Sequence, residues 1–304
     1  MKDYLNIVNE KYPIRNEDKE KKEFQDFVLD ELKDSKYNVS VQNLQKKHKN
    51  IVIGNVEKAS VVFTAHYDTP ATALYPNLVM PRRPVLTMLY HFAFPIAMAL
   101  LSLFITYLLC LASGVSEIIA MIFYLDIYFM MFLLCTFAFK NKNNKNDNTS
   151  GVACVLELAK MNERDDIAFI LFDNEEKGLL GSKAFNKANK NIMKDKLVIN
   201  MDCVGLGKNV LFIAQKDAMK NDNYAFLKDC VRSNEEFNVE FYPVKGSMGN
   251  SDYKSFKCGV GVMVCEENKL GYFTSKIHTN KDTVADKENI EFLVNELNKF
   301  IMKL

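Results

Sequence analysis

The segment Ser60-Val-Val-Phe-Thr-Ala-His-Tyr-Asp68 is an apolar run that ends in an imidazole and a carboxylate. Two similar runs are also followed closely by acidic residues: Asp166–Phe172 by Glu175 and Glu176, and Lys196–Met201 by Asp202. Short apolar runs of this kind are typical of strands buried in an α/β sheet. Ligands bind beyond the carboxyl ends of such strands, so these side chains are expected at one rim of the sheet. The sequence therefore predicts an α/β fold with a functional site at that rim.

Five side chains form a candidate set of metal ligands: His66, Asp147, Glu176, Asp202 and His278. Zinc is bound by imidazole nitrogen and carboxylate oxygen where thiolates are absent. Two metal ions about 3.5–4 Å apart also need a carboxylate that bridges them. Asp147 precedes a helical pattern and so falls on a loop at a helix N-terminus. Of the four histidines, only His66 and His278 have carboxylates nearby in a suitable context.

The order of these residues resembles that of the co-catalytic zinc aminopeptidases related to bacterial leucyl aminopeptidase. That family also includes glutamate carboxypeptidases and glutaminyl cyclases. The matching motifs are His66-Tyr-Asp68, Asp147-Asn148 with Ser150-Gly151, Glu175-Glu176 with Gly178 and Gly181-Ser182, Asn200-Met-Asp202 with Gly205, Ser251-Asp252, and His278 with Asp282-Thr283. They cover residues 15–70 and 143–304. The resemblance implies a mixed, largely parallel central sheet flanked by helices.

The resemblance also implies how two zinc ions would be held. Asp147 would bridge them, with Glu176 and His278 completing one site and His66 and Asp202 the other. A cis peptide after the bridging aspartate is a further implication. Cobalt or manganese could occupy the same nitrogen and oxygen ligands.

The resemblance assigns catalytic roles to two carboxylates. Glu175 would be the general base that takes a proton from a zinc-activated water and passes it to the leaving amine. Asp68 would hydrogen-bond the second ring nitrogen of His66 and so fix its tautomer. Tyr253 is expected to pack rather than to stabilise an oxyanion, and Asp282 with Thr283 to cap the following helix.

A long apolar insertion separates Asp68 from Asp147. Its segments Val85–Ala112 and Ile118–Phe139 hold almost no charge, and at 1.5 Å per helical residue either can cross a hydrocarbon core about 30 Å thick. We predict a transmembrane helical hairpin at residues 85–139, inserted into one catalytic domain formed by residues 1–84 and 140–304. The alternative is a hairpin that covers a large soluble enzyme or makes a dimer interface.

Charge around the insertion predicts its orientation. The turn at residues 113–117 has no Lys or Arg, whereas basic residues flank the spans: Arg82, Arg83, Lys140, Lys142 and Lys145. The positive-inside rule then places the catalytic domain on the cytoplasmic side of the cell membrane. The first ten residues lack the apolar core of an export signal. Seven cysteines without paired spacing also suit a reducing compartment.

Two residues disturb the apolar spans. Asp126 would cost about 2.5–3.5 kcal/mol at the centre of a span. We therefore expect it to mark a helix contact within the hairpin or between protomers, which makes a homo-oligomer possible. Pro95 is expected to kink the first span.

Two segments outside the spans have a local interpretation. Asn141–Asn146 reads as a linker from the membrane to Asp147, and Asp18–Leu32 as an amphipathic covering helix. The net charge of +1 gives no reason to expect a nucleic-acid partner.

The preferred function is an aminopeptidase acting on short peptides. None of the five arginines lies in an active-site motif, which favours a free amino terminus held by carboxylates over a free carboxylate held by guanidinium. One alternative is a glutaminyl-cyclase-like enzyme, which would use one zinc. Another is a catalytically inactive, membrane-anchored binding or scaffold protein. The hairpin could also form an entry path for a membrane-derived peptide.

Overall fold

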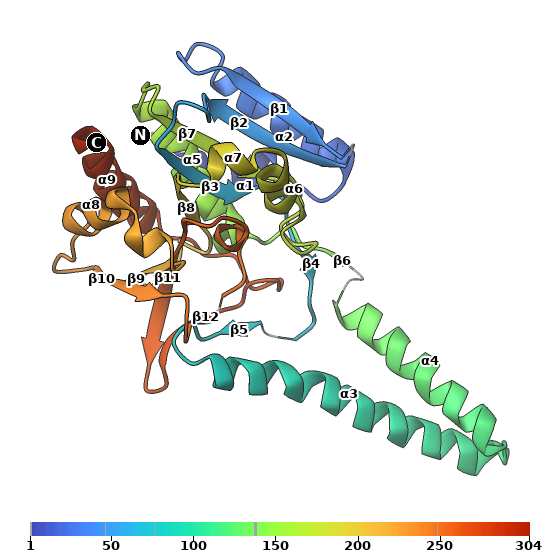
Figure 1. Ribbon diagram of the computed structural model, residues 1–304. Coiled ribbons are helices and arrows are strands. Elements are labelled where there is room, and N and C mark those ends of the chain that lie inside the picture. The colour runs from blue at the N-terminus through green and yellow to red at the C-terminus, as the bar shows by residue number, and fades with distance from the viewer. Residues whose placement is uncertain (1, 46, 76, 137–138, 248) are drawn as a thin grey trace.

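A ten-stranded mixed sheet lies at the centre of the computed structural model, which describes residues 2–45, 47–75, 77–136, 139–247 and 249–304 (Figure 1). Its path runs β1-β2-β7-β3-β8-β11-β12-β5, and β9 joins β11 to β10. The strands are β1 Val39–Leu44, β2 His48–Gly54, β3 Val61–His66, β5 Leu78–Val79, β7 Ile167–Phe172, β8 Leu197–Met201, β9 Asn209–Ala214, β10 Asn238–Pro243, β11 Gly259–Asn268 and β12 Gly271–Ser275.

The middle of the sheet is parallel, as expected. Strands β7, β3, β8 and β11 run in the same direction, while β1 and β2 form an antiparallel edge. Every residue of β3, β7 and β8 is buried, because these runs are apolar and both faces of the sheet are covered. The three predicted strands and the α/β fold class are therefore confirmed.

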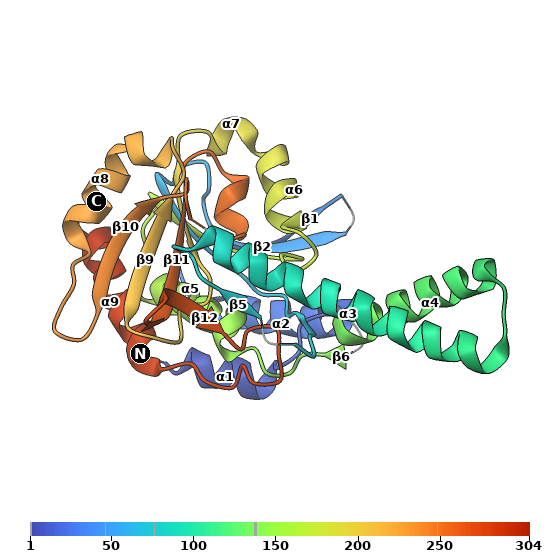
Figure 2. The same ribbon diagram turned by 90° about the horizontal axis from the view of Figure 1, so that it is seen from below.

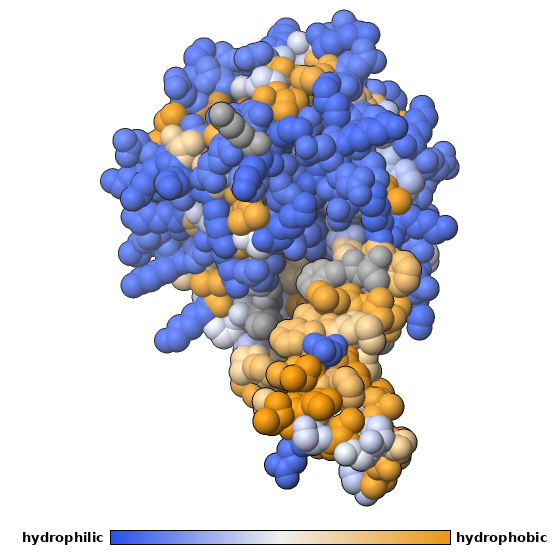
Figure 3. Space-filling view, turned by 90° about the vertical axis from the view of Figure 1, so that its right-hand side faces the viewer, coloured by the Kyte–Doolittle hydropathy of each residue, from blue (hydrophilic) through white to orange (hydrophobic). Residues whose placement is uncertain are grey.

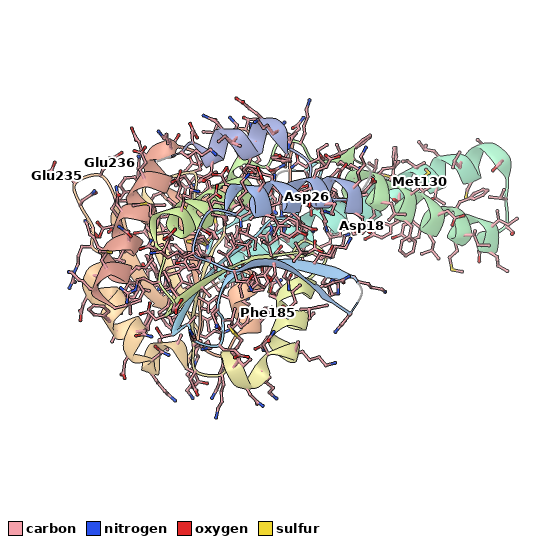
Figure 4. The ribbon with its side chains drawn as sticks, turned by 90° about the horizontal axis from the view of Figure 1, so that it is seen from above. Asp18, Asp26, Met130, Phe185, Glu235 and Glu236 are labelled. Atoms are coloured by element: carbon pink, nitrogen blue, oxygen red, sulfur yellow. The ribbon has the colours of Figure 1, made fainter. Side chains whose placement is uncertain are left out.

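Helices cover the two faces of the sheet. One face carries α1 Tyr4–Lys11, α2 Asp18–Glu31, α5 Ser150–Met161, α8 Asp222–Cys230 and α9 Lys287–Lys303. The other carries α6 Leu180–Ala188 and α7 Lys190–Met193. Figure 4 shows Asp18 and Asp26 of α2 on one side of the sheet and Phe185 of α6 on the other. The expected covering helix is α2, which buries Phe24 and Val28 completely.

The insertion leaves and re-enters this body through short strand pairs. Strand β4 (Ala71–Thr72) pairs with β6 (Phe139–Lys140), and β5 pairs with β12. Between them, α3 (Pro84–Ser113) and α4 (Glu117–Thr136) form an antiparallel hairpin that projects from the body (Figure 1). Figure 3 shows this projection as a hydrophobic surface below a hydrophilic body.

Both hairpin helices are long and apolar enough to cross a membrane, judged by length and composition. Their side chains are mostly exposed, with Leu103 56% and Ile122 49% accessible. The alternative of a buried hairpin that covers the body of its own chain is therefore wrong, and a dimer interface made by the hairpin stays a prediction. Asp126 is exposed on α4 rather than buried against α3, so a contact between protomers stays a prediction. Helix α3 continues through Pro95.

The segment Asn141–Asn146 is not the linker that its composition suggested. Asn141, Asn144 and Asn146 are all buried. The amide oxygen of Asn144 accepts hydrogen bonds from Thr149 at 2.7 Å and from Arg15 at 3.3 Å. Polar side chains in this segment therefore replace the hydrogen bonds that a regular element would make.

Candidate metal centre

The five proposed ligands come from separate loops at one rim of the sheet. His66 ends β3, and Asp202 directly follows β8. Glu176 lies four residues after β7, and His278 lies three residues after β12. Asp147 lies on the turn before α5. The parallel strands β3, β7 and β8 thus deliver His66, Glu176 and Asp202 to the same edge, and the loops after β12 and before α5 bring His278 and Asp147 to it.

Their ligand atoms form two groups that share Asp147. In the first group, His66 Nε2 lies 3.2 Å from Asp147 Oδ1 and 3.8 Å from Asp202 Oδ1. In the second, His278 Nε2 lies 3.0 Å from Asp147 Oδ2 and 3.2 Å from Glu176 Oε2. The two carboxylate oxygens of Asp147 therefore lie beside two different groups of candidate metal ligands.

The turn that carries Asp147 is held by Asp282. The carboxylate of Asp282 accepts hydrogen bonds from the backbone N–H of Asn146 at 2.9 Å and of Asp147 at 3.0 Å. The expectation that Asp282 caps the next helix is wrong, because that helix begins at Lys287 with Asp286 at its N-cap. Sequence reasoning missed this role because the two partners lie more than a hundred residues apart.

The peptide bond between Asp147 and Asn148 is cis, as the resemblance implied. The side chain of Asn148 donates to the carbonyl of Met201 at 3.0 Å and accepts from Gly151 N–H at 3.1 Å. A Cβ atom at Gly151 would lie 2.4 Å from both the Asn148 oxygen and the Met201 carbonyl. Only glycine therefore fits where α5 begins beneath the metal loop.

Asp68 holds the turn that carries Glu175. Its carboxylate accepts hydrogen bonds from the backbone N–H groups of Glu175 at 2.9 Å and of Glu176 at 3.2 Å. The ring nitrogen Nδ1 of His66 lies 3.1 Å from the carbonyl oxygen of Asp68 and 3.6 Å from its carboxylate. The hydrogen bond to His66 that we expected from the carboxylate is thus made by the backbone of the same residue.

Arg15 connects the N-terminal segment to the metal loop. It is completely buried and donates to the carbonyl of Tyr67 at 2.5 Å and to Thr149 Oγ1 at 3.1 Å. Burial lowers its pKa to about 10, against the opposing charge of Asp68. These hydrogen bonds join the segment after β3 to the turn before α5, so Arg15 positions the loops that carry the ligands.

The site is crowded with carboxyl groups whose pKa values are displaced. Burial, followed by the charge of Asp147, raises the pKa of Glu176 to about 8. Burial also raises the pKa of Glu175 well above its usual range. Burial would raise the pKa of Asp147, but hydrogen bonds to His278 and His66 hold it below its usual range. Burial would lower the pKa of His278, but the charge of Glu176 raises it to about 10. This excess of negative charge favours a bound cation.

The donor set fits divalent metal ions such as zinc. It contains only imidazole nitrogen and carboxylate oxygen, which are zinc ligands in proteins. Glu176 Oε1 is buried and has no hydrogen-bond partner among the described residues. A buried, unpaired carboxylate oxygen is costly unless it is protonated or binds a cation. The residues present therefore suit a metal centre built around Asp147.

A cavity of about 350 Å³ opens beside this cluster. Its lining includes the titratable residues Asp147, Glu175, Glu176, Asp202 and His278, and the apolar residues Val79, Ile213, Tyr253, Val262, Met263 and Ile277. Tyr253 is buried and packs against Gly261, which agrees with the packing role expected for it.

Two residues of α3, Thr87 and His91, also line the cavity. Sequence reasoning missed them because it treated the first span as uniformly apolar. A signal was present, since they are polar residues four positions apart and so share one face of the helix.

This fold and cluster define a metallopeptidase-like protein. The chain belongs to peptidase family M28, whose sequence model matches residues 139–294. No curated protein sequence matches the chain significantly.

Solved structures share the fold at low sequence identity. The LapA aminopeptidase of Legionella pneumophila is 13% identical with a TM-score of 0.58, and the match covers 99% of this chain and 69% of that one. The glutaminyl cyclase of Porphyromonas gingivalis is 13% identical with a TM-score of 0.56, covering 99% and 96%. BSAP, a zinc aminopeptidase from Bacillus subtilis, is 17% identical with a TM-score of 0.50, covering 84% and 50%. At these identities the likeness establishes the fold.

Proposed function

We propose that the protein is a membrane-anchored, zinc-dependent aminopeptidase that hydrolyses the N-terminal peptide bond of short peptides. The observation that carries this proposal is the pair of ligand groups that share Asp147, with Glu175 beside them. Membership of a peptidase family supports the reaction class. Cleavage of a peptide bond needs an attacking water, a proton acceptor and a way to stabilise charge on the carbonyl oxygen, and this arrangement can supply all three.

In this proposal the metal ligands keep the roles that the family resemblance implies. Asp147 would bridge two zinc ions, Glu176 and His278 would hold one, and His66 and Asp202 the other. When bound, the ions would polarise the scissile carbonyl and lower the pKa of water toward about 7. Cobalt or manganese could replace zinc on the same ligands.

Glu175 would act as the general base. It would accept a proton from the attacking water and deliver it to the nitrogen of the leaving amine when the peptide bond breaks. Its backbone is fixed by the hydrogen bond to Asp68, which also limits the positions open to its carboxylate. Asp68 is thus a positioning residue for both the base and His66.

The lining of the cavity favours a substrate with a free amino group over one with a free carboxylate. Of the described residues that line it, none is Lys or Arg, whereas several are carboxylates. Two bound zinc ions would offset the charge of these ligands, but no guanidinium or ammonium group among the described lining residues would be available to hold a free peptide carboxylate. This supports an aminopeptidase over a carboxypeptidase.

Anchoring would come from the hairpin of α3 and α4. Its exposed apolar surface and its length both suit a bilayer. Arg82 and Arg83 before α3 and Lys140 after α4 favour a catalytic domain on the cytoplasmic side. Extraction of membranes with alkaline carbonate should leave the protein in the pellet, and its release into the supernatant would contradict anchoring.

The decisive experiment combines metal analysis with a peptide panel on detergent-purified protein. Wild type should contain two zinc ions per chain and release N-terminal residues from short peptides. Glu175→Gln should retain zinc but lose activity by about 10²–10⁴-fold, whereas the exposed control Glu267→Gln should match wild type. One zinc ion with cyclisation of N-terminal glutamine would favour the glutaminyl-cyclase alternative. Bound zinc with no turnover of any peptide would favour a binding protein.

A further inference from the structure

The insertion supplies part of the wall of the active-site cavity. Asn77 and Val79 line it from the segment before α3, and Thr87 and His91 line it from the first turns of that helix. Thr87 is buried and accepts a hydrogen bond from Met80 N–H at 2.9 Å. Met80 directly follows β5, which pairs with β12, so these contacts attach the start of α3 to the catalytic body and the hairpin is more than an appended anchor.

The opposite face of the same turns is apolar and exposed. Its members recur at helical spacing: Val85, Met88, Leu89, Phe92 and Ile96. Val85 and Leu89 are 68% and 62% accessible. One side of α3 therefore faces the cavity while the other presents a continuous apolar stripe. Such a stripe is suited to the boundary between headgroups and acyl chains.

The second helix accompanies only the distal part of α3 (Figure 2). Ser102 Oγ lies 3.8 Å from Met131 Sδ, so antiparallel pairing brings the end of α4 opposite about residue 97. From there to Ser113, α3 is about 26 Å long at 1.5 Å per residue. The 20 residues of α4 are about 30 Å long.

These lengths match a hydrocarbon core of about 30 Å without the first turns of α3. The paired parts of the two helices are thus sufficient to cross the bilayer. Residues 84–96 continue the same helix for about 20 Å beyond the core toward the body, and Thr87 and His91 line the cavity from one side of these turns. Thr87 and His91 then lie about 9–15 Å beyond the edge of the hydrocarbon core, so this wall of the cavity is close to the headgroups.

We propose that the substrates of this site are peptides attached to the same membrane, whose free amino ends lie close to its surface. This rests on the proposed aminopeptidase function and specifies its substrate class. A cavity of about 350 Å³ holds only the first residues of a peptide, so the remainder must leave through the mouth.

The test compares linker lengths in proteoliposomes that contain the purified protein. One peptide sequence is presented free, joined to a lipid through a short linker, or joined through a long flexible linker. The short-linker peptide should be cleaved at least as fast as the long-linker peptide, because the cavity lies close to the headgroups. If only the long-linker peptide is cleaved, the mouth is distant and the inference is wrong while the aminopeptidase function stands. If no form is cleaved, both are wrong.

A charged variant tests the apolar stripe. Leu89→Glu should lower cleavage of the short-linker peptide about tenfold and leave the free peptide unaffected, because charge at this position disfavours contact with lipid. Met302→Glu, at an exposed position on α9, should behave as wild type. Equal short-linker activity of Leu89→Glu and wild type would count against the inference.

Depth can be measured without activity, because the chain contains no tryptophan. The fluorescence of Leu89→Trp should be quenched by lipids that carry a quencher near the headgroup. Leu103→Trp should be quenched by lipids labelled deep in the acyl chain, and Met302→Trp by neither. Absence of shallow quenching at position 89 would overturn the proposed location of the mouth.

Discussion

A buried ion pair between Lys21 and Asp173 lies next to the turn that carries Glu175. Lys21 of α2 extends its Nζ to within 2.6 Å of Asp173 Oδ1, and donates to Asn174 Oδ1 at 2.8 Å. The two charged side chains are 3% and 2% accessible. Neither charge reaches water, so removing one partner leaves the other uncompensated in the interior.

We predict that Lys21→Met strongly destabilises the protein. Methionine keeps the aliphatic length but leaves the charge of Asp173 unpaired, which costs about 3–5 kcal/mol for a buried pair. At about 2–4 °C per kcal/mol for a domain of this size, the melting temperature should fall by about 6–20 °C. Zinc affinity should fall as well, because Glu175 and Glu176 follow Asp173 almost directly.

The double variant Lys21→Met/Asp173→Asn separates charge from packing. It removes the uncompensated charge, so it should recover most of the loss. Thermal melts in detergent, followed by circular dichroism, provide the measurement. The control is Lys33→Met, whose partner Asp30 lies on the surface, and its melting temperature should be unchanged. The reasoning is refuted if Lys21→Met melts like wild type, or if the double variant is no more stable than the single one.

Three further predictions concern other parts of the chain. Asp282→Ala should lower zinc affinity about 10–100-fold in a chelator competition, because the backbone of Asn146 and Asp147 loses its acceptor; unchanged affinity would contradict this role. Burial raises the pKa of Glu157 from 4.5 to about 6, so folding favours its protonated form and stability is lost as the pH rises through about 6. Glu157→Gln should therefore raise the melting temperature at pH 8 and not at pH 4, and an equal gain at both would exclude this cause. Asp126→Leu should reduce self-association in detergent, and unchanged sedimentation would exclude a contact there.

The strands were predictable because their signal is local. An uninterrupted apolar run such as Ile167–Phe172 is buried on both faces of the sheet wherever the strand lies. The rim residues follow from the strands, since parallel strands end at one edge. His66 and Asp202 are therefore brought to within 3.8 Å of each other, although 136 positions separate them in the sequence.

Hydrogen-bond partners between distant loops were not predictable in this way. Asp282 is an ordinary helix-cap residue by its neighbours in sequence, yet its carboxylate binds a loop that lies 135 positions earlier. The asparagine-rich segment 141–146 has the composition of a linker, yet three of its asparagines are buried. The amino-acid composition shows that a side chain can make hydrogen bonds. Only the fold determines whether its partner is water or another part of the protein.

In the first predicted span, the sequence likewise does not show what surrounds the apolar residues. Its hydropathy indicates an apolar environment but does not distinguish lipid from the wall of a cavity. The two polar residues Thr87 and His91 are the features that separate the two faces, because a helix face turned toward lipid offers them no partners. Here Thr87 binds the backbone of Met80, and His91 Nε2 lies 3.1 Å from the carbonyl of Leu78. Polar residues at helical spacing inside an apolar span therefore indicate the side on which protein lies, and in this chain that side lines the cavity beside the candidate metal centre.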